Sequence, residues 1–541
     1  MKTNTPLHLE IQKHRKNYYG LLRTSYREDG KVKHTTHGRI TCASLEQLKL
    51  IQAVFRGEVT LRNQEQMPKV LKSKEYGASY TILELARELG LDKVIYSKPN
   101  KQWVQDCLAM IAGRLIYAGS KLSLSNRYKD TALWELCGVF GKVDVDEHCY
   151  PSMDYLLKRQ KAMQISLAKK HLNNNSLVLY DITSSYFEGE YENSMLVKFG
   201  YNRDRKSGTE QIVIGLICAA NGCPIAVEVF AGNTKDETTV YDKIVEVKNI
   251  YGVSNIIFVG DRGIMTSANI ARTRDLQGFA MISALTHPQI NDLLQRNIIK
   301  PSLFDEKNIV EIIDPEDPSR RYCLCKNVAT AIRETETRKA ILERISKKLN
   351  IIANSKKKTT DNQIAVRVGK ALANTTVGKF IDCQIHNGRL SWTLKEDTIA
   401  TESLLDGCYI IVSDVTQNRL DYEELVASYR KLALVEKAFR NLKTTQLEIR
   451  PIYHKTDYRI RCHVFLCVLA YYLQWHMMER LKPLFESNGE HNERFWTFAN
   501  VIERLKSIRQ EEILISGTTC NVITQPDEDQ KKILELLKVK L

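Results

Sequence analysis

The sequence contains no run of about 18 apolar residues, the length that a helix needs to cross a bilayer. Its longest apolar stretch, Val464 to Leu473, is too short, so we expect no membrane partner. The first residues, Met1 to Pro6, have no apolar segment after their charge and predict no secretory signal. Internal repeats and low-complexity tracts are also missing. A hydrophobic fraction of 43% and a charged fraction of 26% are typical of a soluble globular protein.

The 13 cysteines do not form a recognisable framework. The close pairs, Cys323/Cys325 and Cys462/Cys467, lack a second pair at the spacing of a zinc ribbon. We therefore expect reduced and mostly buried thiols in a cytoplasmic protein, and these spacings do not predict a zinc site.

Acidic residues are too few to balance the basic ones. Lys and Arg number 79 against 64 Asp and Glu, which leaves a net charge of +15 and a pI of about 9.1. Such a charge is found in many basic proteins, but it also favours a polyanion partner, because Lys and Arg that neutralise phosphates release counterions. With 541 residues, the chain is expected to form two to four domains.

The N-terminal part of the chain predicts two regions without obvious chemistry. Residues 1–70 predict a basic β region, with a hairpin formed by Tyr18–Ser25 and Val32–Ile40 around a turn at Asp29–Gly30. This hairpin could rest on DNA or be a solvated edge sheet. Residues 71–172 carry apolar residues at three- and four-residue steps and predict a helical region. A role of this region in DNA binding or dimerisation is implied only by the family resemblance given below.

Residues 173–285 and 405–480 predict an α/β domain. Short apolar strands are expected at 177–180, 211–219, 224–231, 255–259, 279–283 and 408–413. Two of them are followed directly by an aspartate, Asp181 and Asp261. Ligands of open α/β sheets bind at the carboxyl ends of strands, so these aspartates are candidate site residues.

Two further regions flank the end of this domain. Residues 286–404 predict a β-rich insertion, with a second hairpin at Asn387–Gly388. Residues 481–541 predict a C-terminal helical region that supports packing rather than chemistry.

One late helix carries the third candidate acid. Ser428 to Lys443 contains no helix breaker, and Asp421 is a suitable start signal ahead of it. Tyr429, Glu436 and Lys443 follow each other at seven-residue steps and would form one stripe. Because most of the remaining girth is apolar, we expect a buried helix with Glu436 held inside or in a cleft. An ion pair with Arg440 is the simpler alternative.

Asp181, Asp261 and Glu436 could meet where strand ends face this helix. Three clustered carboxylates repel one another unless a cation lies among them. Mg²⁺ suits such a site because it prefers oxygen ligands, and Mn²⁺ could replace it. Two ions of this kind can support in-line phosphoryl transfer, with Arg262, Arg440 and Lys443 available to offset charge at the phosphate.

Residues 177–480 resemble the catalytic domain of bacterial insertion-sequence DDE transposases, in the subgroup with a β-rich insertion before the glutamate. The resemblance is carried by the segments around the three acids and by two further recurrent stretches. These segments are Tyr180–Gly189, Val259–Gly263, the Tyr429/Glu436/Lys443 signature, Gly232–Asp236 and Arg450–His454. It implies a ribonuclease H-like α/β fold with Asp181, Asp261 and Glu436 as catalytic metal ligands.

The resemblance also implies DNA contacts. Tyr429 and Lys443 would touch the DNA backbone near the scissile phosphate, with Arg262 as a weaker candidate. The signature has an arginine where this chain has Leu432, so Arg430 or Arg440 would have to replace it.

The activity implied is nicking of double-stranded DNA at the element's ends, followed by attack of the freed 3′-hydroxyl on target DNA. A homodimer holding two ends, associated with the bacterial nucleoid, is expected. Two alternatives keep the fold and change the activity: a metal-dependent nuclease without strand transfer, and an inactive DNA-binding derivative.

Overall fold

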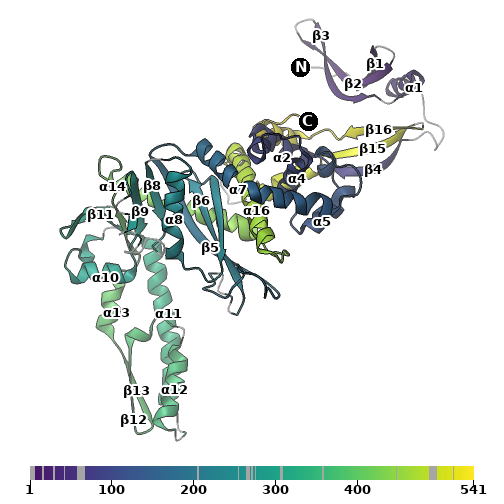
Figure 1. The fold of residues 1–541 in the computed structure, drawn as a ribbon. Helices are drawn as coiled ribbons and strands as arrows, with labels where there is room; N and C mark the ends of the chain where they lie inside the picture. The colour runs from purple at the N-terminus through teal and green to yellow at the C-terminus, as the bar shows by residue number, and fades with distance from the viewer. Residues whose placement is uncertain are drawn as a thin grey trace.

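The computed structural model describes most of the chain and shows an elongated molecule with a central sheet (Figure 1). The residues outside the description are 1–6, 15–16, 29–30, 42, 58–67, 204–205, 207, 254, 263–268, 270–271, 274–275, 305–308, 356, 358, 374, 446, 487–495 and 516. The expected turn at Asp29–Gly30 and Gly263 of the second aspartate segment lie among them. In the described part no single helix is long and apolar enough to cross a membrane, although the bent pair Gln102–Ile116 and Lys121–Lys129 would pass on length and composition.

The N-terminal sheet has three strands and its own small core. β1 (His8–His14), β2 (Asn17–Glu28) and β3 (Lys31–Ile40) pair in antiparallel order, and α1 (Leu45–Phe55) packs on them. The predicted hairpin is confirmed as β2–β3, while β1 was not predicted. Leu9, Ile40 and Leu48 are buried between this sheet and α1.

A mostly helical region is built from two parts of the chain, residues 69–171 and 482–537. Its elements are β4 (Lys69–Glu75), α2 (Gly77–Glu88), α3 (Leu91–Ile95), α4 (Gln102–Ile116), α5 (Lys121–Asn126), α6 (Leu133–Leu136), α7 (Tyr150–His171), α17 (Lys482–Glu486), α18 (Phe498–Lys506), β15 (Arg509–Ile515), β16 (Thr518–Ile523) and α19 (Glu528–Leu537). The prediction of a helical C-terminal region is wrong in one respect, because β15 and β16 form a hairpin that pairs with β4. The pairing partner lies more than 400 residues away, at Lys72↔Glu512, where local sequence patterns cannot reveal it.

The central sheet has eight strands in the order β10-β11-β14-β9-β8-β5-β6-β7. The strands are β5 (Ser176–Tyr186), β6 (Gln211–Ala219), β7 (Pro224–Ala231), β8 (Ile256–Gly260), β9 (Phe279–Ala284), β10 (Val310–Asp314), β11 (Asp317–Lys326) and β14 (Cys408–Ser413). β5, β8 and β9 run parallel, and the remaining neighbours pair antiparallel. All residues of β6 and β8 are buried, which explains their continuous apolar sequences.

Helices cover this sheet. They are α8 (Asp236–Asn249), α10 (His287–Gln295), α14 (Tyr422–Arg430), α15 (Leu432–Arg440) and α16 (Asp457–Arg480). α15 packs on β5, α14 on β8 and β9, and α16 together with α7 on β7. The helix predicted over Ser428 to Lys443 is therefore divided at Lys431, and a π turn follows α15 at Asn441–Thr445.

The prediction that residues 286–404 are β-rich is wrong. β10 and β11 extend the central sheet, and α11 (Val328–Ala353), α12 (Asp361–Leu372), β12 (Ile381–His386), β13 (Arg389–Leu394) and α13 (Glu396–Ser403) form an arm that projects from its end (Figure 1). α11 alone has 26 residues, about as many as the four strands together. The arm buries a separate core between its two long helices and the β12–β13 hairpin, because the amphipathic faces of α11 and α12 need a partner.

The described cysteines agree with the expectation of reduced thiols. None of them is in a disulfide, and nine of the twelve are buried. Most of these belong to the large core that runs from the helical region through the central sheet into α16.

Candidate active site

The register of two parallel strands places the two predicted aspartates side by side. Tyr180 of β5 pairs with Gly260 of β8, so the next residue on each strand is an aspartate, Asp181 and Asp261. Asp261 directly follows the last residue of β8, while β5 continues to Tyr186. Asp181 is accordingly half-buried and Asp261 exposed.

α15 brings the third acid to the same place. Its buried side consists of Leu432, Val435, Ala438 and Phe439, and this side packs on β5. Glu436 lies on the other side and lines one pocket together with Asp181 and Asp261. The prediction of a buried helix is wrong, because α15 is amphipathic. Of the two places expected for Glu436, inside the protein or in a cleft, the second is found: its side chain is exposed toward this pocket.

The three carboxylates influence one another. Burial, together with the negative charges of Asp261 and Glu436, raises the pKa of Asp181 to about 7. The backbone N–H of Ile182, which donates to Asp181 Oδ1 at 2.8 Å, and the charge of Arg203 act in the opposite direction. The charges of both other acids therefore act on the ionisation of Asp181.

Tyr429 and Arg262 line the same pocket as the three acids. Burial raises the pKa of the Tyr429 hydroxyl, and the charge of Asp261 raises it further while that of Arg262 lowers it. Asp261 Oδ1 accepts from the backbone N–H of Arg262 at 2.7 Å, which fixes the carboxylate at the start of this loop.

Arg430 and Leu432 both line the pocket, on either side of the break between α14 and α15. Leu432 is only 8% exposed and contributes to the core. Arg430 is exposed and its Nη2 donates to the Tyr409 hydroxyl at 3.3 Å. Of the two replacements considered for the missing arginine, Arg430 is the one at the pocket.

Two other predicted residues lie elsewhere. Lys443, in the π turn after α15, lines a neighbouring pocket with Tyr186 and Arg450, whose guanidinium lies 4.1 Å from the centre of the Tyr186 ring. Arg440 is exposed at the end of α15 and does not line the pocket of the three acids.

Sequence reasoning missed three residues at the site. Arg203 acts on Asp181 from the loop between β5 and β6, and Tyr409 and Asn327 line the pocket from β14 and the end of β11. Arg203 lies in an irregular loop, where no periodic pattern of apolar residues marks its position. Tyr409 and Asn327 come from elements whose neighbours in the sheet are distant in sequence, so no local pattern points to them.

The donor set suits a hard divalent cation. Three carboxylates line one pocket, and the half-buried one has a raised pKa. A cation among them would relieve this repulsion. Mg²⁺ and Mn²⁺ prefer oxygen ligands of this kind.

Comparison with known protein families identifies the catalytic part of the chain. A family model described as a transposase DDE domain matches residues 176–473, which is more than half of the chain. The match begins at the first residue of β5, ends within α16 and includes all three acids. Comparison with curated proteins finds no match.

Proposed function

The chain belongs to the family of transposases with a DDE domain, and from this premise we propose that it cleaves the ends of an insertion sequence and joins them to target DNA. Proteins of this family generally use divalent metals. The observation that supports the proposal most is the meeting of Asp181, Asp261 and Glu436 in one pocket. The strand order β7-β6-β5-β8-β9, with β6 antiparallel to β5, supports a ribonuclease H-like catalytic domain.

In this proposal the three carboxylates would hold Mg²⁺. Two such ions activate the attacking oxygen and stabilise the leaving one when they are bound. Asp181 and Asp261 gain their relative position from the β5–β8 register, and Glu436 gains its position from the packing of α15 on β5. These rigid elements keep the donors in place before DNA arrives, which is the condition for efficient phosphoryl transfer.

The same pocket offers groups for the DNA backbone. Arg262 and Arg430 would offset negative charge at the scissile phosphate, and the Tyr429 hydroxyl would donate to a phosphate oxygen. Lys443 and Arg450 would hold the strand as it continues over the neighbouring pocket. Arg440 is a weaker candidate for this role because it lies outside both pocket linings.

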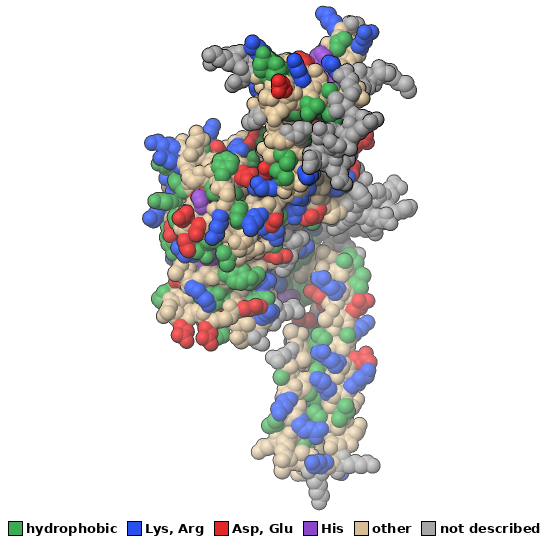
Figure 2. Space-filling view, turned by 90° about the vertical axis from the view of Figure 1, so that its right-hand side faces the viewer, with side chains coloured by type: hydrophobic (Ala, Val, Ile, Leu, Met, Phe, Trp, Pro, Cys, Tyr) green, Lys and Arg blue, Asp and Glu red, His purple; other side chains and the backbone are tan. Residues whose placement is uncertain are grey.

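The arm provides a further surface for DNA. Basic side chains outnumber acidic ones in residues 328–403, and Figure 2 shows Lys and Arg along the visible face of the arm. We therefore propose that the arm clamps DNA.

We also propose that the protein binds DNA as a homodimer, because two element ends must be held in one complex. Light scattering of the protein with end DNA tests the dimer: two chains per complex support it, and one chain overturns it.

The decisive experiment incubates the protein with the DNA that flanks its own gene, a target duplex and Mg²⁺, and maps the products to the nucleotide. Joined products support a transposase. Cleavage without joining would favour the nuclease alternative, and binding without Mg²⁺-dependent cleavage the inactive derivative. Glu436→Gln should reduce cleavage at least about 100-fold, with DNA binding retained.

Glu423→Gln is the matched control, since Glu423 is an exposed carboxylate on α14 outside the pocket. It should cleave as the unmodified protein does. Equal activity of Glu436→Gln and the unmodified protein would overturn the assignment of Glu436.

A further inference from the structure

A second cluster of potential metal ligands lies outside the pocket of the three acids. It contains His171 at the end of α7, Cys223 in the turn between β6 and β7, and His476 in α16. One ligand atom from each residue lies within 4.8 Å of the others, and His171 Nε2 is 3.9 Å from Cys223 Sγ. The three residues are distant in sequence, so their spacing carries no recognisable motif.

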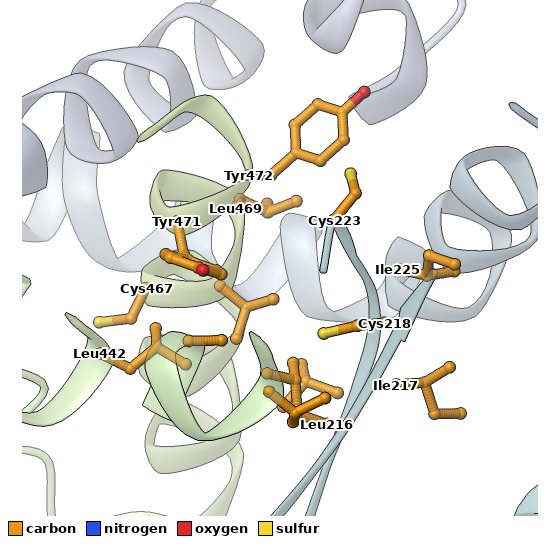
Figure 3. Close-up of a cluster of buried hydrophobic side chains, with 14 of the residues drawn as sticks. Leu216, Ile217, Cys218, Cys223, Ile225, Leu442, Cys467, Leu469, Tyr471 and Tyr472 are labelled. Atoms are coloured by element: carbon orange, nitrogen blue, oxygen red, sulfur yellow. The ribbon is translucent and has the colours of Figure 1, made fainter. Parts of the chain in front are cut away.

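The surroundings of His476 give an independent reason to consider a ligand. Its Nε2 is buried, and in the described part of the chain it has no hydrogen-bond partner. A buried polar atom without a partner costs about 1–3 kcal/mol, so such atoms are rare unless something else satisfies them. The neighbouring Tyr472 hydroxyl is 3.0 Å from His171 Nε2. Figure 3 shows the Cys223 thiol beside the Tyr472 ring.

We propose that His171, Cys223 and His476 form a structural Zn²⁺ site, with the Tyr472 hydroxyl or a water as the fourth ligand. A thiolate with imidazoles is a donor set that zinc prefers, whereas Mg²⁺ prefers oxygen. Tetrahedral zinc with Zn–S of about 2.3 Å and Zn–N of about 2.0 Å separates S from N by about 3.5 Å. The 3.9 Å between His171 Nε2 and Cys223 Sγ is close to this S–N separation. The ligand atom of His476 lies within 4.8 Å of the other two, so small side-chain rotations would bring it to coordination distance. The Cys223 thiol loses its proton to solvent when zinc binds.

The site would hold the β6–β7 turn in place. The turn is fixed to α16 by Trp475, whose Nε1 donates to the Asn221 carbonyl at 3.3 Å. On its other side the turn packs on α15 so tightly that a Cβ at Gly222 would lie 3.0 Å from the Leu434 Cβ. Leu434 is two residues before Glu436, so zinc would stabilise the support on which α15 rests.

The experiment uses the full-length protein, treated with EDTA, reconstituted with Zn²⁺ in excess Mg²⁺ and freed of unbound metal. We expect one zinc per chain by mass spectrometry. Cys223→Ser and His476→Gln should each lose it. Cys218→Ser is the matched control, because Cys218 is a buried thiol of β6 outside the cluster, and it should retain the metal.

Cobalt gives a readout that does not depend on any variant folding. Reconstitution of the unmodified protein with Co²⁺ should produce the charge-transfer absorption of a thiolate–cobalt bond, which the carboxylates of the acid pocket cannot produce. This signal should be absent in Cys223→Ser and present in Cys218→Ser. Absence of the signal in the unmodified protein, or equal zinc content in all variants, would overturn the site. Either result leaves the proposed transposase function untouched.

Discussion

Asp181 differs from the other two acids of the pocket in its surroundings. It is half-buried within β5, whereas Asp261 and Glu436 are exposed at a strand end and on a helix face. Burial and the two neighbouring negative charges raise its pKa to about 7, and the nearby charge of Arg203 offsets only part of this effect. Three negative charges would therefore lie close together although Asp181 is poorly solvated. A cation bound among the three carboxylates would stabilise their charged forms.

Arg430 is the residue that we expect to replace the signature arginine. Arg430→Ala should weaken binding of end DNA about tenfold and reduce the dependence of log K on log salt by about 1, because one phosphate contact is lost. Lys437→Ala, which removes an exposed cation of α15 outside the pocket, is the control and should bind nearly as the unmodified protein does. Fluorescence anisotropy at several salt concentrations measures both. A larger loss in Arg440→Ala than in Arg430→Ala would contradict the assignment.

At the scale of elements, the division between α14 and α15 shows where packing overrides local preference. Lys431 is neither glycine nor proline, and nothing in Ser428 to Lys443 marks a break. The buried residues of α14 face β8 and β9, while those of α15 face β5. A single straight helix could not bury both sets, so the chain turns at Lys431. Asp421, by contrast, was recognisable, and it caps α14 in a capping box with Glu424.

The central strands were predictable because they are buried on both faces and therefore read as apolar runs. The β6–β7 and β12–β13 hairpins were predictable from Asn-Gly turns, whose glycines have φ of +83° and +72°. β15 was missed because its sequence begins Arg-Gln-Glu-Glu and its partner β4 is distant. The two aspartates of the site follow apolar strands and were found, whereas Arg203 lies in an irregular loop and was not.

Gly222 connects the β6–β7 turn to α15, and its replacement should separate the effects of backbone and packing. Gly222→Ala places a Cβ 3.0 Å from the Leu434 Cβ at a φ of +83°. Gly252→Ala has a similar φ of +72° but no atom within 4 Å, so it is the matched control. Both should lose about 1 kcal/mol from backbone strain.

Gly222→Ala should lose a further 1–3 kcal/mol, roughly the cost of overpacking, and cleave DNA more slowly. Urea unfolding measures the stabilities. Equal costs for the two variants would show that the turn does not support α15.

At the scale of the whole molecule, three separate cores divide the chain. The N-terminal sheet and the arm each bury their own residues, and the large core joins the helical region to the central sheet. Within the large core, Lys121 of α5 is buried and its Nζ lies 2.9 Å from His463 Nδ1 on α16. His463 Nε2 lies 3.0 Å from the Ile449 carbonyl, and the His454 ring packs 5.6 Å from the His463 ring. This polar cluster therefore links the N-terminal helices to the segment that follows the active-site helix.

The cluster predicts that the protein loses stability in mild acid. Burial, followed by the charge of Lys121, lowers the pKa of His454 to about 3 and that of His463 well below its ordinary value. In the unfolded chain both histidines bind protons near pH 6.5, so between about pH 3 and 6.5 the unfolded state binds more protons than the folded one. Stability from these groups is complete above about pH 6.5 and falls as the pH drops, by up to about 2 kcal/mol for each histidine at about pH 5.

His454→Gln should reduce the difference in urea midpoint between about pH 7 and pH 5, because one of the two groups no longer titrates. His386→Gln, at an exposed position of the arm hairpin, is the control and should keep the full difference. If His454→Gln retained the same loss of stability in acid as the control, the histidine would have to be protonated in the folded protein. The contact between the helical region and α16 would then be held together by charge rather than by buried neutral rings.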